Sequence, residues 1–318
     1  MTTQFELRDR TNKISDSLST VEKGKISGSL DTQSNDKNPF VYPATFNSLY
    51  TYANELDDHT NRTIKSWLQT LIGGVLLSFF ASMLFVWIAT LGTTVGRRFG
   101  DPITETITTA LAQGFGLFAA LSLVPKKIPF CINPTITLIE LFMGHSRTIH
   151  SSWIHGIIYT ILAMAFSLVG SITGAAITSA IDSSEVLGLP IPRPINANFT
   201  IGSIFLLEVI GSFLLAWIFF IVSYDPKPRK MKNGAHILGL ALASLVFIGN
   251  NYTGASFNWI RHFGPLVLSG QYRPLTDWIY YIAPLVGHIV AALAWYFLFR
   301  TSRDSDNLDS KKKSMPSY

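Results

Sequence analysis

The sequence is poor in cysteine and in charge. Its 318 residues include one cysteine, Cys131, which excludes an intramolecular disulfide framework. Only 14% of the residues are charged, whereas a soluble domain of this size carries about a quarter. The charges gather in two polar end segments, 1–64 and 301–318, which we expect to be flexible tails. The long apolar body between them, 65–300, is therefore predicted to lie in a lipid bilayer.

Six apolar segments are long enough to cross the hydrocarbon core, which takes about 20 helical residues. Two further apolar stretches, 130–143 and 257–268, are too short to cross, and each carries an asparagine at a plausible helix start. Short helices that re-enter one membrane face are tolerated where protein or water covers their backbone. We therefore predict an all-α membrane protein with six transmembrane helices and two re-entrant half-helices. The six spans are expected near 67–92, 103–124, 152–178, 201–223, 235–250 and 278–299.

Basic residues flank the spans unevenly. Lys and Arg crowd the 224–234 connection and follow the last span, whereas the 179–200 connection has a single basic residue, Arg193. The positive-inside rule then predicts that both termini are cytoplasmic, with Arg97 and Arg98 as exceptions to the rule. Because the cations flank membrane spans rather than forming a phosphate-binding face, no nucleic-acid partner is expected. We expect the plasma membrane as the location.

The two halves of the body repeat. The stretch SFFASMLFVWI at 78–88 aligns with EVIGSFLLAWI at 208–218, and each half continues through a span, an asparagine-started half-helix and another span. Three spans per half is an odd number, so the second half inserts upside down. Inverted repeats hold their functional site at the midplane, where interrupted helices meet. Repeat 1 is predicted at about 65–178 and repeat 2 at about 200–300.

The half-helices are expected to meet at their N-termini, Asn133 and Asn258. Each N-terminus presents unpaired N–H groups and about half a positive charge. Both asparagines are predicted to cap these ends and to turn amide donors toward the lumen. Such a site binds neutral molecules and repels cations, and Arg261, three residues beyond Asn258, adds a full charge.

These motifs resemble the major intrinsic protein family, the aquaporins and aquaglyceroporins. YTGASFNWIRHFGP at 252–265 is similar to the family pattern TG-x-x-x-NPAR-x-x-GP, and INPTITL at 132–138 is similar to its first signature. The family's fourth-span glutamate stands at Glu208, and DWIYYIAPLVGH at 277–288 resembles the start of its sixth span. The resemblance covers everything but the tails. It implies a homotetramer with one pore per subunit and no cofactor.

The sequence departs from the family pattern within both signatures. Thr135 replaces an alanine after the retained Pro134. Trp259 replaces a proline, so it either stacks on Pro134 and locks the half-helices together or faces a neighbouring helix or lipid. Ile260 replaces an alanine and either narrows the lumen or packs behind the half-helix.

Further departures lie in the spans. Ser78 stands where the repeat expects an acid, so one buried carboxylate is missing. Glu208 remains and is expected to accept backbone N–H groups near the second half-helix, the alternative being a proton relay. His288 replaces a small residue and is interpreted as a core histidine rather than a ligand. The spans contain no motif of an enzyme, and no metal site is expected.

In the family, the constriction combines residues of the second span, the fifth span and the loop before the second asparagine with the arginine. The resemblance implies Val246, Ala255 and Arg261 here, together with either Phe115 or Gln113 from the second span. Strict water channels place a histidine where Val246 falls, so a wider opening is implied. The predicted function is a passive channel for water and small neutral solutes: glycerol, urea, ammonia and hydrogen peroxide. The alternatives are a non-conducting structural member and a proton-coupled transporter.

Overall fold

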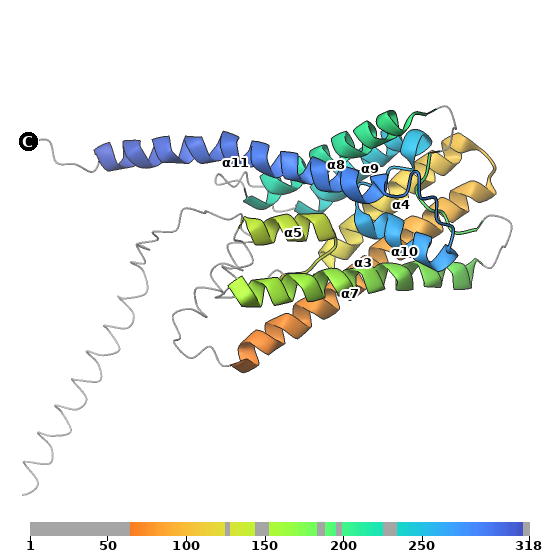
Figure 1. Cartoon of the computed structure of the whole chain (residues 1–318), viewed down its shortest axis with the longest axis horizontal. Coiled ribbons are helices and arrows are strands. Elements are labelled where there is room, and N and C mark those ends of the chain that lie inside the picture. Colours follow the sequence, from red (N-terminus) through yellow and green to blue (C-terminus); the bar gives the residue numbers. More distant parts are fainter. Residues whose placement is uncertain are drawn as a thin grey trace, which may run out of the picture. The chain divides into compact units, whose positions relative to one another are not determined.

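The computed structural model describes residues 64–124, 128–143, 153–182, 188–194, 199–224 and 234–313. These residues form helices and contain no strand (Figure 1). The polar N-terminal segment, which from its many Ser and Thr residues is also a candidate for regulating the body, lies before Ile64 and outside the described residues. The helices are α3 (Ile64–Arg98), α4 (Pro102–Ser122), α5 (Pro134–Phe142), α7 (Trp153–Ile181), α8 (Ile201–Tyr224), α9 (Gly234–Thr253), α10 (Trp259–Ser269) and α11 (Ile279–Lys313).

Five described helices, α3, α7, α8, α9 and α11, are long and apolar enough to cross a membrane. The 21-residue α4 occupies the position of the predicted second span, but its threonines and Gln113 make it less apolar. Several of these polar groups are satisfied without water. Thr108, for example, donates to the backbone oxygen of Thr104 on the preceding turn at 2.9 Å. The polar residues of α4 are therefore compatible with a helix packed between two others, α3 and α9.

The two halves have the same order of elements: two long helices, a half-helix and a third long helix. In each half the first helix packs on the second and the last, so α3 contacts α4 and α7, and α8 contacts α9 and α11. The halves join where α4 packs on α9. Each half-helix reaches the other half: α10 packs mainly on α7, and α5 packs on α11 as well as on α7 of its own half. Figure 1 shows α5 and α10 toward opposite ends of the body.

Glycines allow close approach where the long helices cross. A Cβ atom on Gly170 of α7 would lie 2.3 Å from the backbone oxygen of Phe79 on α3. Its counterpart in the second half is Gly287 of α11, whose Cβ would lie 2.4 Å from the backbone oxygen of Val209 on α8. No side chain fits at such distances, and small residues at crossings are typical of helix packing in lipid.

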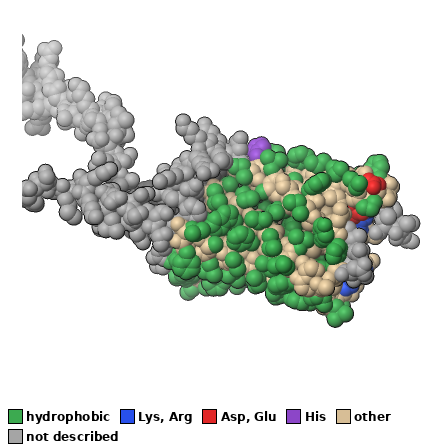
Figure 2. All heavy atoms as spheres, turned by 90° about the horizontal axis from the view of Figure 1, so that it is seen from above, with side chains coloured by type: hydrophobic (Ala, Val, Ile, Leu, Met, Phe, Trp, Pro, Cys, Tyr) green, Lys and Arg blue, Asp and Glu red, His purple; other side chains and the backbone are tan. Residues whose placement is uncertain are grey.

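The outer surface of the body is apolar. Along α4, for example, Ile103, Ile107, Leu111 and Phe115 recur every four residues and are 41–67% exposed. Figure 2 shows hydrophobic side chains over most of one face, with the charged side chains at one end. A surface of this kind is stable against lipid rather than against water. The arrangement is that of a multi-pass integral membrane protein.

The last helix corrects the prediction for the C-terminus. Residues after 300 were expected to form a flexible tail because they are polar, yet α11 continues to Lys313. The sequence offers a physical reason, since no glycine or proline interrupts the chain between Gly287 and Pro316. Without such a residue a helix has no strong local signal to stop.

Candidate functional site

The loop that precedes α10 has a strained backbone. Ala255 and Phe257 have positive φ angles of 45° and 51°, and among the described residues only glycines share this sign. Gly254, with φ 80°, lies so close to a neighbouring loop that a Cβ atom would be 2.5 Å from the backbone N of Arg193. Left-handed conformations of this kind persist only when the surroundings fix them.

Glu208 of α8 holds this strained loop in place. Its carboxylate is fully buried and accepts three hydrogen bonds: from Thr253 Oγ1 at 2.6 Å, Ser256 N at 3.1 Å and Phe257 N at 2.9 Å. Both oxygens are therefore occupied by donors of one loop. Bonds to a charged acceptor are about twice as strong as neutral ones, which suits a segment whose backbone is strained.

Asn258 ends this loop and links the two half-helices. Its Oδ1 accepts from Ile260 N at 3.2 Å and so caps α10. Its Nδ2 donates across the repeat to the backbone oxygen of Ile132, immediately before α5, at 2.8 Å. This hydrogen bond brings the N-terminus of α10 to the N-terminus of α5.

Asn133 differs from the prediction. It precedes α5, but its side chain makes no capping hydrogen bond to the helix. Instead, Oδ1 accepts from the hydroxyl of Thr135 at 2.8 Å. The expectation that both asparagines cap their half-helices is therefore wrong for Asn133, because a hydroxyl group two residues away takes the place of the backbone donor. Pro134 is buried at the first position of α5.

The first half uses a serine where the second uses Glu208. Ser78 Oγ accepts from the backbone N of Cys131 at 2.8 Å and donates to the backbone oxygen of Gly74 at 2.6 Å. One turn further along α3, Ser82 Oγ donates to the Cys131 oxygen at 3.3 Å. Hydroxyl groups thus hold the loop before α5.

Arg261 lies in the first turn of α10 and is 1% exposed. Nη1 donates to the backbone oxygen of Pro190 at 3.0 Å, and Nη2 donates to Thr93 Oγ1 at 3.3 Å. The Nε group has no partner among the described residues. The guanidinium is therefore held by α3 and by the 188–194 segment, while its Nε–H group stays unpaired among the described residues. The sequence did not point to Thr93 or to Pro190, because both contacts join segments far apart in the chain.

Three of the four remaining constriction candidates are buried. Val246 of α9 and Ala255 have no exposed surface and belong to one apolar cluster. Gln113 of α4 is also fully buried, and its amide atoms have no partner among the described residues. Phe115 is 58% exposed on the outward stripe of α4, so of the two alternatives from the second span it is excluded and Gln113 is retained. The helical spacing of the stripe, starting at Ile103, was the signal that could have decided this.

Trp259 and Ile260 have different surroundings. The Trp259 indole donates to the backbone oxygen of Tyr281 on α11 at 2.8 Å, and its ring packs edge-on against that of Tyr281. Of the two interpretations of Trp259, the structure favours the one in which it faces a neighbouring helix. Ile260 has no exposed surface and belongs to the cluster that contains Val246.

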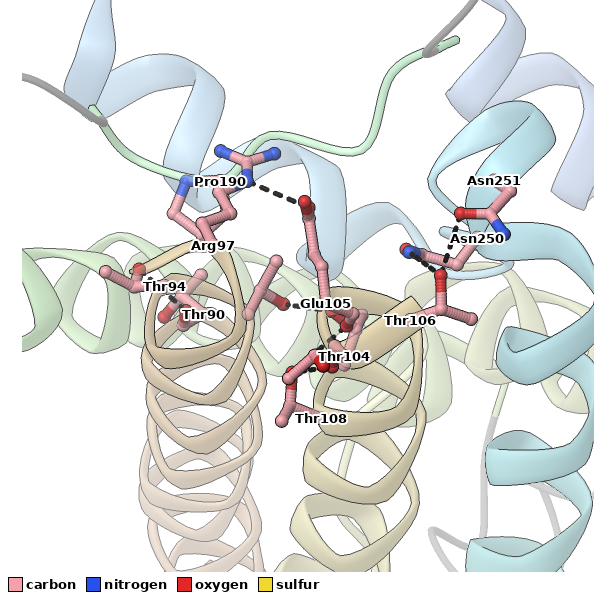
Figure 3. Close-up of polar contacts among 12 residues, drawn as sticks. Thr90, Thr94, Arg97, Thr104, Glu105, Thr106, Thr108, Pro190, Asn250 and Asn251 are labelled. Carbon is pink, nitrogen blue, oxygen red and sulfur yellow. Dashed lines mark hydrogen bonds and ion pairs between the residues drawn. The ribbon is translucent and has the colours of Figure 1, made fainter. Parts of the chain in front are cut away.

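Three ion pairs, which we call the rim, join residues at the ends of the long helices and in their connections. Arg97 pairs with Glu105 at 2.9 Å, Arg98 with Asp182 at 2.6 Å, and Arg193 approaches Asp277 to 3.7 Å. Figure 3 shows Arg97 reaching from the end of α3 to Glu105 on α4. Burial lowers the pKa of the Arg193 guanidinium, and the Asp277 carboxylate opposes that shift.

Another contact beside the rim joins the two halves of the body. Figure 3 shows the hydroxyl of Thr106 on α4 facing both Asn250 and Asn251 of α9. The Thr106 hydroxyl donates to Asn251 Oδ1 at 2.7 Å and accepts from Asn250 Nδ2 at 3.2 Å. These bonds tie the start of α4 to the end of α9, next to the segment that leads into α10.

An inverted pair of half-helices that meet N-terminus to N-terminus inside a membrane bundle is typical of membrane transport proteins. The sequence profile described as "Major intrinsic protein" matches residues 65–295. The chain belongs to the major intrinsic protein family, and it is therefore a channel rather than an enzyme.

Curated relatives agree with this assignment, and a solved structure shares the fold. The chain is 26% identical over 224 residues to Aquaporin-5 from Homo sapiens, covering 70% of this chain and 80% of that protein. It is 30% identical over 229 residues to "Probable aquaporin TIP5-1" from Oryza sativa subsp. japonica, covering 68% and 79%. The fold is similar to the X-ray structure of the aquaglyceroporin from Plasmodium falciparum, with a TM-score of 0.62, 14% identity, and coverage of 74% of this chain and 99% of that one.

Proposed function

We propose that the chain is a passive channel for water and small neutral solutes that excludes ions and protons. The observation that carries this proposal is the meeting of the two half-helices, in which Asn258 Nδ2 lies 2.8 Å from the Ile132 oxygen. Two helix N-termini directed at one point combine their positive ends, and Arg261 lies one turn away. A neutral molecule with a lone pair is stabilised there, whereas a cation is repelled.

The proposed filter consists of Gln113, Val246, Ala255 and Arg261. Val246 and Ala255 offer small apolar side chains, and the free groups of Gln113 and Arg261 offer hydrogen bonds. One apolar side and one polar side suit glycerol, urea, ammonia and hydrogen peroxide as well as water. A histidine at position 246 would narrow this opening.

We further propose a plasma-membrane homotetramer with both termini in the cytoplasm. The basic residues of the 224–234 connection and the run of three lysines at the end of α11 support this orientation. Arg97 and Arg98 would then lie outside, against the rule. Both are held in ion pairs, with Glu105 and Asp182, and they stay exceptions to a rule that counts Lys and Arg rather than net charge.

The decisive measurement is stopped-flow light scattering of proteoliposomes that contain the purified protein. We expect fast shrinkage in a sucrose gradient, which reports water, and uptake of glycerol and urea above that of empty vesicles. Val246→His should lower glycerol uptake on the order of tenfold while water permeation persists, since a larger polar side chain enters the filter. Val246→Ala is the matched control and should keep glycerol uptake.

Each outcome separates the alternatives. A wild type that conducts water but none of these solutes contradicts the wide filter, whereas one that conducts nothing favours the non-conducting structural member. A proton-coupled transporter would respond to an imposed proton gradient. The hydrogen bonds at Glu208 disfavour that alternative, because both carboxylate oxygens hold the loop before α10.

A further inference from the structure

Two departures from the family pattern, Thr135 and His288, contact each other beside Asn133. The Thr135 hydroxyl pairs with Nδ1 of His288 on α11 and lies 2.8 Å from Oδ1 of Asn133. Thr135 and His288 have no exposed surface, and Asn133 keeps 6%. The three side chains therefore form a hydrogen-bonded chain at the N-terminus of α5.

The protons in this chain have a defined direction. A hydroxyl group has one proton, and the Oδ1 atom of Asn133 can only accept, so Thr135 donates to Asn133. His288 must then donate to Thr135 through an Nδ1–H group. Its Nε2 atom is buried and has no partner among the described residues. A bare Nε2 fits that environment, because a buried N–H without an acceptor is costly.

We infer that His288 is a positioning residue of the pore, which acts through Thr135 to fix the Asn133 amide with Nδ2 available to a permeating molecule. This inference rests on the proposed channel function. The opposite tautomer of His288 would make Thr135 donate to the histidine and would turn the Asn133 amide around. A carbonyl oxygen would then face the lumen and attract cations, so the imidazole orientation contributes to cation exclusion.

A comparison with the second half shows why side chains are needed to fix the Asn133 amide. There, Asn258 Oδ1 is fixed by the backbone N of Ile260, a group that cannot reverse its direction. Asn133 lacks the equivalent bond to the backbone of α5. Side chains therefore take over a role that the helix itself performs at Asn258.

Paired substitutions test the chain of hydrogen bonds. Thr135→Val keeps the shape of Thr135 but removes the hydroxyl, and His288→Leu removes the donor. Each should lower water permeation per channel on the order of fivefold, the worth of about one hydrogen bond, and should raise the proton leak. Thr135→Ser and His288→Asn keep the groups involved and should stay near wild type. The double variant should be no worse than either single variant, because both break one chain.

The control is Thr90→Val, which removes a fully buried hydroxyl that pairs with Thr178 Oγ1 at 2.6 Å between α3 and α7. It should leave the ratio of proton leak to water permeation unchanged. An equal change in that ratio for Thr90→Val would mean that Thr135→Val acts through general loosening and would overturn the inference.

Nitrogen-15 NMR of histidine-labelled protein, with the His288 signal assigned from its absence in His288→Asn, gives an independent readout. A protonated Nδ1 with a bare Nε2 supports the inference, and the reverse tautomer overturns it. A wild type that conducts no water would contradict the proposed function, while the tautomer would still decide the hydrogen-bond direction.

Discussion

The loop before α10 and the loop before α5 enter the body in the same way, but different groups hold them. In the second half, the carboxylate of Glu208 accepts three hydrogen bonds from its loop. At the equivalent position of the first half, the hydroxyl of Ser78 accepts one, from the backbone of Cys131. The fold repeats, while the chemistry that fixes it does not.

Backbone strain accounts for the difference. The loop before α10 contains Ala255 and Phe257 with positive φ angles, and each such residue costs on the order of 1–3 kcal/mol. The described loop before α5 contains no residue of this kind. A charged acceptor is needed where the backbone is strained, and a hydroxyl group suffices where it is not. An inverted repeat can therefore lose one of its two buried acids without losing its shape.

The largest expected effect comes from removing the acid. Glu208→Gln replaces an accepting oxygen by an amide NH₂ that faces donors, and we expect the free energy of unfolding to fall by about 4 kcal/mol. Ser78→Ala leaves one N–H unpaired and should cost about 1.5 kcal/mol. Thermal unfolding in detergent, followed by circular dichroism, measures both. Equal losses would break the comparison between the two loops.

A smaller effect is expected from the glycine beneath the strained loop. A Cβ atom on Gly211 would lie 2.1 Å from the ring of Phe257, whereas the equivalent position of the first half carries Ala81. Gly211→Ala should destabilise the protein by about 2 kcal/mol through overpacking. Ala81→Gly should cost about 1 kcal/mol, because it only weakens a helix. If Phe257→Leu fails to restore stability to Gly211→Ala, the clash with the ring is not the cause.

The smallest effect on stability is expected at the two asparagines. Asn258→Asp loses the donor to the Ile132 oxygen and should cost about 1 kcal/mol. Asn133→Asp keeps the acceptor for Thr135 and should cost less. Both variants place an anion at the donor site and should weaken cation exclusion, which ion-flux assays on proteoliposomes measure. Unchanged selectivity in both, at normal incorporation, would contradict their proposed place in the pore.

Most of the fold follows from the sequence because membrane helices obey strong local rules. Span length, the short stretches around Asn133 and Asn258, and the order of elements all depend on residues close together in the chain. The prediction of a flexible C-terminal tail was wrong for a related reason. Polarity predicts that a segment leaves the membrane, but it does not predict that the helix ends at that point.

The details of the site depend on contacts that no local pattern contains. Thr135 and His288 are 153 residues apart, so the sequence presents them as two unrelated departures. The Thr135 hydroxyl reaches Oδ1 of Asn133 from two residues away, but only the packing of α11 brings His288 against that hydroxyl. The ion pairs of the rim could not be predicted for the same reason, since Arg98 and Asp182 are 84 residues apart. The outward face of a helix, by contrast, can be predicted from the spacing of its apolar residues. The outward stripe of α4 that ends at Phe115 could have decided between Phe115 and Gln113 as the filter residue of the second span.

The hydrogen bond between Asn258 and Ile132 has a consequence for biosynthesis. The two residues are 126 positions apart, so the ribosome delivers the acceptor long before its donor. Until α10 enters the bundle, the carbonyl group at the start of α5 has no partner from the second half, at a depth where an unpaired carbonyl is costly. The two half-helices can therefore meet only late in synthesis. A chain truncated before Asn258 leaves the Ile132 carbonyl group without this donor inside the bilayer.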